Sequence, residues 1–170
     1  MKTILVTGGT GLVGYSLNSI KDKYNYNFVF LSSKDCDLTN YCKTYKLFSK
    51  IKPDYVIHLA ANVGGLYKNI KMKKEIFEDN LSINLNILKC CNIFNVERLL
   101  SCLSTCIFPD EIDYPISEKD LHKGPPHNSN YAYSYSKRML HIHTKLYREQ
   151  FNKKYSCIIP TNIYGPNDNF

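Results

Sequence analysis

The sequence predicts an α/β fold, a doubly wound parallel sheet in three α/β/α layers. Two observations predict it. Short apolar runs alternate with longer segments of helical spacing along the 170 residues, and the first apolar run leads directly into a glycine-rich turn. Alternating strands and helices favour a parallel sheet, because each helix carries the chain back to the start of the next strand. With right-handed crossovers we expect the strand order 3-2-1-4-5.

Each expected element follows from a local pattern. Apolar runs predict strands at residues 2–7, 28–31, 55–60, 98–103 and 157–160. Helical spacing predicts helices at residues 12–23, 38–50, 73–94 and 130–154. Pro53 supports a helix end near residue 50, and residues 111–129 are rich in turn formers.

Length and composition bound the class of protein. A hydrophobic content of 44% and a charged content of 22% are typical of a soluble globular chain. No run approaches the ~20 apolar residues that a membrane helix needs. The apolar stretch at the N-terminus is too short for a signal peptide, so we expect a cytoplasmic protein with no membrane partner. We expect residues 1–170 to be one nucleotide-binding domain cut off inside a loop, with a substrate-binding domain following residue 170.

Charge and cysteine usage disfavour several other classes. The net charge is +7, but the lysines are dispersed, which favours a phosphate-rich small ligand or plain composition over nucleic acid. The seven cysteines form no C-x-x-C pair, so we expect mostly buried thiols rather than disulfides. The five histidines have no carboxylate or cysteine partners at ligand spacing, so no metal site is expected.

A phosphate cradle is expected where the first strand meets the first helix. Three glycines, Gly8, Gly11 and Gly14, recur every third residue there. Glycine lets the backbone turn tightly against a pyrophosphate, and the helix N-terminus that follows offers free N–H groups. An ordinary strand-to-helix turn is the alternative. The expected dinucleotide-binding residues are Gly8, Gly9, Thr10, Gly11, Leu12, Val13 and Gly14.

The residues after the second strand favour NADP(H) as the cofactor. Lys34 lies 20 residues beyond Gly14, where the adenosine ribose is expected. A cation there, supported by Ser33, favours the 2′-phosphate of NADP, whereas an acid such as the adjacent Asp35 would favour NAD. Asp37 is expected beside the adenine or, alternatively, is the N-cap of the second helix. The expected contacts to the adenosine half are Ser33, Lys34, Asp37 and Leu38.

A tyrosine and a lysine at helical spacing indicate acid–base chemistry. Tyr133 lies four residues before Lys137, so both side chains share one helix face, whereas Tyr131 and Tyr135 point elsewhere. A phenol with its ordinary pKa near 10 is a slow acid at neutral pH. An ammonium about 4 Å away would stabilise the phenolate by roughly 4 kcal/mol and lower that pKa. A surface tyrosine–lysine pair is the alternative.

Together these motifs resemble the extended short-chain dehydrogenase/reductase superfamily. The matching parts are TGGTGLVG at 7–14, HLAA at 58–61, Ser104, and Y-x-x-x-K at Tyr133 and Lys137. The resemblance implies a Rossmann fold and a triad in which Ser104 hydrogen-bonds the substrate carbonyl and Tyr133 protonates it while the cofactor delivers hydride. It also implies cofactor contacts from Ala60, Ala61, Tyr133, Lys137, Pro160, Asn162 and Ile163.

Cys106 is not needed by a simple reductase. Two residues beyond Ser104 at the end of a strand, it would face the same ligand. In a 4-keto sugar the protons on C3 and C5 are acidic, because the donors that polarise the ketone also stabilise the enolate. A thiolate is a suitable base for removing those protons. The alternative is a buried structural thiol.

Longer segments narrow the resemblance. HLAANVGGLYKNIK, LLSCLSTCIFP, PPHNSNYAYSYSKRM and IIPTNIYGPNDNF are similar to epimerase-reductases of that superfamily, which convert GDP-4-keto-6-deoxy-D-mannose to GDP-L-fucose by 3,5-epimerisation and NADPH-dependent reduction at C4. This resemblance implies that Cys106 is the epimerisation base and that the protein is a homodimer joined through residues 81–88 and 139–147. The implied substrate contacts are Val63, Gly64, Ser104, Cys106, Asn162 and Asn167.

One position departs from the pattern of those enzymes. Their motif carries a histidine where this chain has Asn167, and that histidine returns a proton after epimerisation. An amide cannot supply a proton at neutral pH, and losing a positioned acid costs about 10²–10⁴ in rate, so we expect weak epimerisation. His127 is either a substitute acid or a solvated loop residue. A 4-keto nucleotide-sugar reductase without epimerase activity and a non-catalytic NADP-binding fragment therefore stay open.

Overall fold

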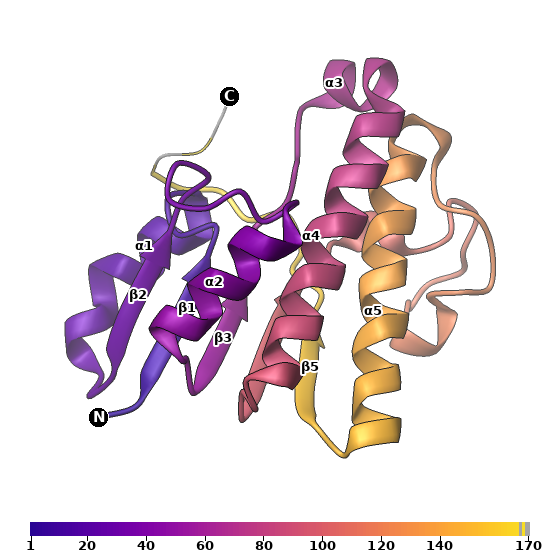
Figure 1. Cartoon of the computed structure of the whole chain (residues 1–170). Coiled ribbons are helices and arrows are strands. Elements are labelled where there is room, and N and C mark those ends of the chain that lie inside the picture. The colour runs from indigo at the N-terminus through magenta and orange to yellow at the C-terminus, as the bar shows by residue number, and fades with distance from the viewer. Residues whose placement is uncertain (167, 169–170) are drawn as a thin grey trace.

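The chain folds around a parallel sheet (Figure 1). The structure is a computed structural model that describes residues 1–166 and 168, and over these residues the sheet has five strands. The expected parallel α/β class is confirmed. The strands are β1 (Thr3–Thr7), β2 (Asn27–Leu31), β3 (Tyr55–His58), β4 (Arg98–Cys102) and β5 (Lys154–Ile158).

Helices connect the strands, and short 3₁₀ turns lie between these elements. The helices are α1 (Leu12–Ile20), α2 (Tyr41–Ile51), α3 (Leu66–Lys71), α4 (Lys73–Ile93) and α5 (Tyr131–Phe151). The 3₁₀ turns are η1 (Lys21–Lys23), η2 (Thr105–Ile107), η3 (Glu118–Asp120) and η4 (Asn128–Asn130). No helix in the described part of the chain has the length and apolar content needed to cross a membrane.

The expected strand order was wrong. The order is β2-β1-β3-β4-β5, so β3 pairs with β1, with Thr7 opposite His58, on the edge of β1 away from β2. Right-handed crossovers fix the face on which a connecting helix lies, but they do not fix the edge to which the next strand is added. The direction of winding therefore reverses between β1 and β3, and a crevice opens at their carboxyl ends.

Crossover direction also sets the layers. The crossovers through α2, α4 and α5 all run toward β5, whereas the crossover through α1 runs the other way, which places α1 on the opposite face of the sheet. In Figure 1, α2, α4 and α5 stand side by side in front of the sheet, and α4 packs along α5 and against α2. The core between these helices and the sheet contains Leu5, Val56 and Leu99 from the strands and Phe48 and Ile87 from the helices.

Several boundaries differ from the expected ones. The helix expected at residues 130–154 ends at Phe151, because Asn152 takes a left-handed conformation with φ of 51°, and β5 therefore begins at Lys154 rather than at 157. Sequence reasoning missed α3 entirely. The second helix starts at Tyr41 with Asn40 as its N-cap, whose side chain accepts from the amide of Lys43, so Asp37 is not that cap.

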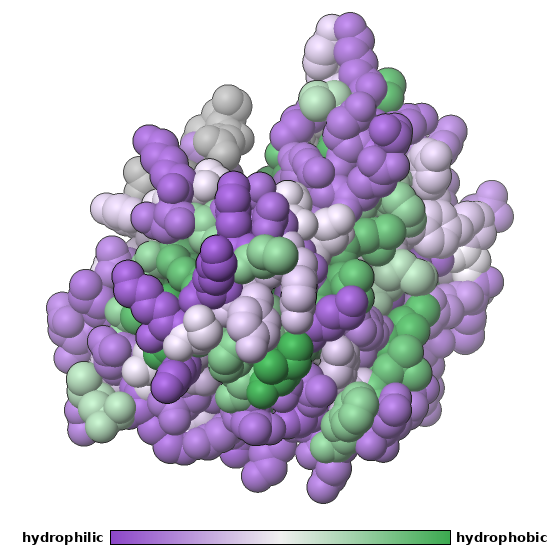
Figure 2. All heavy atoms as spheres, viewed as in Figure 1, coloured by the Kyte–Doolittle hydropathy of each residue, from purple (hydrophilic) through white to green (hydrophobic). Residues whose placement is uncertain are grey.

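The predicted burial of the cysteines was only partly right. All seven cysteines are free, but only Cys90 and Cys91 are buried. Leu88, in the helix face proposed for a dimer, lies in the core of this chain. Figure 2 shows apolar side chains gathered over α4 and α5, where Leu85 and Met139 are 40% and 38% exposed.

A buried amide ties α4 to the segment that leads into α2. Asn86 is 6% exposed and its Nδ2 donates to the carbonyls of Leu38 and Thr39, each at 2.9 Å. Neither carbonyl belongs to a helix or a strand, so the side chain supplies the donor that buried backbone requires. The amide thereby fixes the chain at the rim of the crevice above β1.

Replacing Asn86 by leucine keeps the number and branching of the side-chain heavy atoms and removes both N–H donors. We expect Asn86→Leu to lower the free energy of unfolding by about 1–3 kcal/mol, the usual cost of leaving buried polar groups unpaired. Denaturant unfolding followed by circular dichroism measures the change. The matched control is Asn92→Leu on the same helix, where the side chain is half-buried and a change below about 0.5 kcal/mol is expected. Equal losses in both variants would contradict the assignment.

Candidate active site

The glycine turn after β1 packs closely against its neighbours. Gly8 has a φ of 71°, and a Cβ on it would lie 2.8 Å from the backbone nitrogen of Ala60. A Cβ on Gly14 would lie 2.5 Å from the carbonyl oxygen of Gly8. Only glycine lets α1 sit this close to the turn that precedes it. The backbone at the N-terminus of α1 is therefore open to a ligand, as a phosphate cradle requires.

A groove of about 670 Å³ extends from this turn along the carboxyl ends of β1, β2 and β3. Its wall includes eight of the residues expected to bind the cofactor, namely Gly8, Thr10, Gly11, Ser33, Asp37, Leu38, Ala60 and Ala61. Asp79 and Ile83 of α4 and Asn62 also line it, and no sequence motif indicated them. The residues present fit a bound dinucleotide, with the glycine turn at one end and the segment after β2 at the other.

In the segment after β2, hydrogen bonds engage the carboxylate of Asp35. Oδ2 of Asp35 accepts hydrogen bonds from the amide and the hydroxyl of Ser32, at 2.8 and 2.6 Å, and these bonds lower the pKa of the carboxyl. Asp35 thus closes a tight turn, and Lys34 at its tip is exposed. Asp37 caps its own local turn by accepting from Thr39. An exposed cation and a turn-bound acid match the expected preference for a 2′-phosphate.

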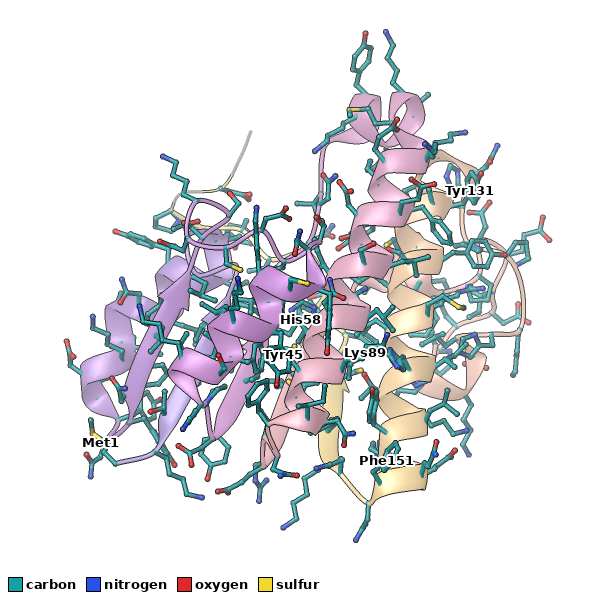
Figure 3. The ribbon with its side chains drawn as sticks, viewed as in Figure 1. Met1, Tyr45, His58, Lys89, Tyr131 and Phe151 are labelled. Carbon is teal, nitrogen blue, oxygen red and sulfur yellow. The ribbon has the colours of Figure 1, made fainter. Side chains whose placement is uncertain are left out.

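Tyr133 and Lys137 meet on one face of α5, as their spacing predicts. The ammonium of Lys137 lies 5.7 Å from the centroid of the Tyr133 ring and donates to the carbonyl of Cys102 at 2.7 Å. Tyr131 lies near the start of α5 (Figure 3), where its ring contacts that of Tyr135 instead. Lys137 is 2% exposed, so the pair is not a surface feature.

The expected lowering of the tyrosine pKa was wrong for this arrangement. Burial raises the pKa of the Tyr133 phenol, and negative charge on the nearby Cys106 and Cys102 would raise it further. Burial likewise lowers the pKa of the Lys137 ammonium. Desolvation sets the direction of both pKa shifts, because both groups leave water, and the ammonium bonds a carbonyl. The phenol is therefore held protonated, as a proton donor must be.

Ser104 and Cys106 do not alternate along a strand. β4 ends at Cys102, and the 3₁₀ turn η2 begins at Thr105, with Ser104 as its N-cap in extended backbone. The amide of Cys106 donates weakly to the Ser104 hydroxyl at 3.5 Å. Both side chains are half-buried. The turn still brings the two residues together, and electrostatic interaction links Cys106 with Tyr133 and Lys137 across the site.

A second hollow, of about 600 Å³, opens beside this turn. Cys106, His127 and Asn130 line it together with Thr161. His127 is exposed, and its Nδ1 accepts from the amide of Ser129 at 3.1 Å, so the ring caps η4. The histidine proposed as a substitute acid therefore borders the same pocket as the cysteine.

Residues beyond β5 connect the pocket to the groove. Ile159 and Thr161 line the pocket, and a Cβ on Gly165 would lie 3.5 Å from Cδ1 of Leu12 in α1. This segment crosses the carboxyl edge of the sheet toward α1 (Figure 1). Pro160, Asn162 and Ile163, three expected cofactor contacts, lie on this crossing, where Asn162 is exposed.

Among the expected substrate contacts in the described residues, Cys106 lines this pocket, whereas Ser104 and Asn162 are not in its lining. Val63 lines the dinucleotide groove and is 54% exposed, while Gly64 packs against the side chain of Lys68. Asn167 lies outside the described residues. Lys68 of α3 also donates to Asn62 Oδ1 at 2.6 Å. This side chain therefore holds the loop against α3.

A buried polar chain that the sequence did not indicate lies beneath the site. His58 is 1% exposed and lies in the interior beside α4 (Figure 3). Its Nδ1 is 2.8 Å from the Thr7 hydroxyl and its Nε2 is 3.0 Å from Asn84 Oδ1. The Thr7 hydroxyl in turn accepts from the amide of Ala60. Burial, and then the charge of Lys137, lowers the pKa of His58 to about 4, so the ring is neutral near pH 7.

Known proteins match the chain over nearly its whole length. "GDP-L-fucose synthase" from Dictyostelium discoideum is 52% identical over 99% of the chain and 54% of the relative, and "Probable GDP-L-fucose synthase" from Drosophila melanogaster is 46% identical over 100% and 54%. The chain thus spans about half the length of the curated relatives it matches.

Solved structures agree with this match. A GDP-L-fucose synthetase from Naegleria fowleri, solved with bound NADP, superposes with a TM-score of 0.92 at 50% identity, over 99% of this chain and 52% of that one. A GDP-mannoheptose C4 reductase from Campylobacter jejuni, with NADP bound, reaches 0.92 at 25% identity over 99% and 54%. The model described as "NAD dependent epimerase/dehydratase family" matches residues 4–170. The chain therefore belongs to the NAD dependent epimerase/dehydratase family.

Proposed function

We propose that this chain is the cofactor-binding and catalytic half of a GDP-L-fucose synthase. In this proposal the protein epimerises GDP-4-keto-6-deoxy-D-mannose at C3 and C5 and then reduces C4 with NADPH. The carrying observation is that Ser104 and Cys106 follow β4 in one turn, across from Tyr133 and Lys137 on α5. The names of the relatives at 52% and 46% identity support the substrate.

The groove supports NADP(H) as the cofactor. The glycine turn would hold the pyrophosphate, Ser33 and Lys34 the 2′-phosphate, and Asp37 and Leu38 the adenine. NADPH bound there would supply a hydride to the sugar. The engaged Asp35 carboxylate and the exposed Lys34 favour the phosphorylated cofactor.

The side chains divide the proton transfers between them. The Cys106 thiolate removes the proton from C5 and later from C3, while Ser104 holds the C4 oxygen and stabilises each enolate. A protonated acid then returns a proton to the opposite face of each carbon, and His127 borders the pocket for that role. When hydride reaches C4, Tyr133 gives its proton to O4, and the Lys137 ammonium, 5.7 Å from the centroid of the Tyr133 ring, would lower the cost of the phenolate that is left.

A C4 reductase without epimerase activity is the second candidate. Its supporting observation is the likeness to the GDP-mannoheptose C4 reductase, with a TM-score of 0.92. That activity would use Ser104, Tyr133 and Lys137 and would leave Cys106 idle. A non-catalytic NADP-binding fragment would leave all four side chains idle.

Three further features belong to this proposal. Residues 1–170 would be one NADP-binding domain, with the substrate-binding domain supplied by chain beyond residue 170. The protein would act in the cytoplasm as a homodimer joined through the apolar surface over α4 and α5, which includes Leu85 and Met139. Its partner molecule would be a GDP-sugar.

Closing the glycine turn should weaken cofactor binding. Gly14→Ala puts a methyl group 2.5 Å from the Gly8 carbonyl oxygen, so α1 must shift away from the cradle. We expect NADPH affinity, measured by fluorescence titration, to fall about 100-fold. The control is Gly65→Ala outside the groove lining, where an added Cβ meets nothing within 4 Å, and it should change NADPH affinity by less than about twofold. Equal losses in both variants would contradict the cradle.

Reversing the charge at Lys34 should change cofactor preference. Lys34→Glu removes a charge-assisted bond to the 2′-phosphate, so NADPH affinity should fall about 10-fold or more while NADH affinity stays within about twofold. Titrations of both cofactors measure the ratio. The control Lys23→Glu makes the same charge change in η1, before β2, and should leave the ratio unaltered. An unchanged ratio in the Lys34 variant would contradict the assignment.

Isotope exchange separates the two half-reactions. With GDP-4-keto-6-deoxy-D-mannose and NADPH in heavy water, deuterium should enter C3 and C5, and NADPH should be consumed. Cys106→Ser should lower deuterium uptake by about 10²–10⁴, and Tyr133→Phe should lower NADPH consumption by a similar factor while uptake continues. Cys42→Ser, at an exposed cysteine on α2, is the control.

The same experiment decides between the candidates. NADPH consumption without ring deuterium in the unaltered chain supports the C4 reductase. NADPH that binds and is never consumed supports the non-catalytic fragment. Undiminished deuterium uptake in Cys106→Ser removes the cysteine from the mechanism.

A further inference from the structure

Arg138 follows Lys137 on α5 and is buried without a carboxylate partner. It is 3% exposed, and no salt bridge among the described residues includes it. Burial lowers the pKa of its guanidinium. A buried charge lowers stability unless hydrogen bonds compensate it. The hydrogen-bond partners of Arg138 therefore indicate its role.

Those partners are backbone carbonyls in two loops. Nε donates to the carbonyl of Ile107 at 2.6 Å, and Nη1 donates to the carbonyl of Gly124 at 2.7 Å. The guanidinium also lies over the Tyr135 ring, with Cζ 5.4 Å from the ring centroid. Nη2 is buried and has no partner among the described residues. One rigid planar group therefore holds two separate segments to α5.

The first segment borders the pocket through Cys106, and the second leads to it through His127. Ile107 closes η2 and follows Cys106 directly. Gly124 packs against Pro109, with a Cβ on it 3.3 Å from the proline Cβ, and the next residue, Pro125, accepts from the amide of Asp110 at 2.9 Å. The loop that Arg138 holds therefore also packs on the chain that leaves η2. Arg138 also lies close enough to Cys106 for the two side chains to interact electrostatically.

We propose that Arg138 is a positioning residue that fixes the Cys106 turn and the loop leading to His127 against the helix that carries Tyr133. This inference rests on the proposed function, because it takes Cys106 to be the base that removes protons from the sugar ring. The hydrogen bond of Lys137 to Cys102 anchors the end of β4, and Arg138 anchors the turn that follows it, five residues further along the chain. Proton abstraction needs the thiol held at a fixed place relative to the sugar, and the guanidinium supplies that constraint.

Amide hydrogen exchange tests the constraint on the chain itself. The reporters are the amides of Ile107, Phe108 and Asp110, which bond Ser104, Thr105 and Pro125. In Arg138→Ala, and in Arg138→Met where the side-chain volume is kept, these amides should exchange about tenfold faster or more. Amides of β1 and α4 should keep their rates. The control Arg148→Ala removes an exposed arginine from the same helix and should alter none of them.

Rescue distinguishes bonding from bulk stability. Guanidinium ion at low millimolar concentration should restore protection in Arg138→Ala to within about threefold, and sodium at equal ionic strength should not. In Arg138→Ala and Arg138→Met the affinity for NADPH should stay within about twofold, because the dinucleotide groove does not include this arginine. Unchanged reporter amides, or faster exchange throughout β1 and α4, would overturn the proposal.

Ring deuteration then tests the link to chemistry. Where the unaltered chain exchanges C3 and C5 protons, Arg138→Met should lower kcat for exchange about tenfold or more and leave KM within about twofold. A rise in KM alone would overturn the positioning role. A chain that exchanges no ring protons refutes the proposed function, and the amide measurement still decides whether Arg138 holds the turn.

Discussion

The hydrogen bond from the Lys137 ammonium to the Cys102 carbonyl, at 2.7 Å, is the contact on which the site depends. An ammonium that is 2% exposed is expensive to bury, and the bond to the last residue of β4 offsets part of that cost. It also sets the distance between α5 and the end of β4. Tyr133, one helical turn earlier, is thereby placed opposite the turn that begins after Ser104.

Sheet topology explains why groove and pocket adjoin. All the described strands are parallel, so their carboxyl ends lie at one edge of the sheet. The direction of winding reverses between the neighbouring strands β1 and β3. The glycine turn leaves β1 at that edge, and the Cys106 turn leaves β4 there. Beneath them the ring of His58 bridges Thr7 and Asn84, and this bridge is polar without adding a charge near pH 7.

Features set by local spacing could be predicted from the sequence, and features set by distant neighbours could not. The glycine turn and the pairing of Tyr133 with Lys137 follow from positions three or four residues apart. The place of β3 depends on which free edge of β1 it joins, and the direction of the Tyr133 pKa depends on burial by the whole fold. The partners of Arg138 are backbone carbonyls, which carry no sequence signature. The end of α5 was readable in principle, because Asn152 is a residue type that tolerates left-handed backbone.

The segment that crosses the carboxyl edge after β5 gives the two sites a shared wall. Ile159 and Thr161 border the cysteine pocket, and Gly165 lies against Leu12 beside the phosphate cradle. Because this short peptide borders both compartments, a change in its backbone conformation would alter the shape of both at once.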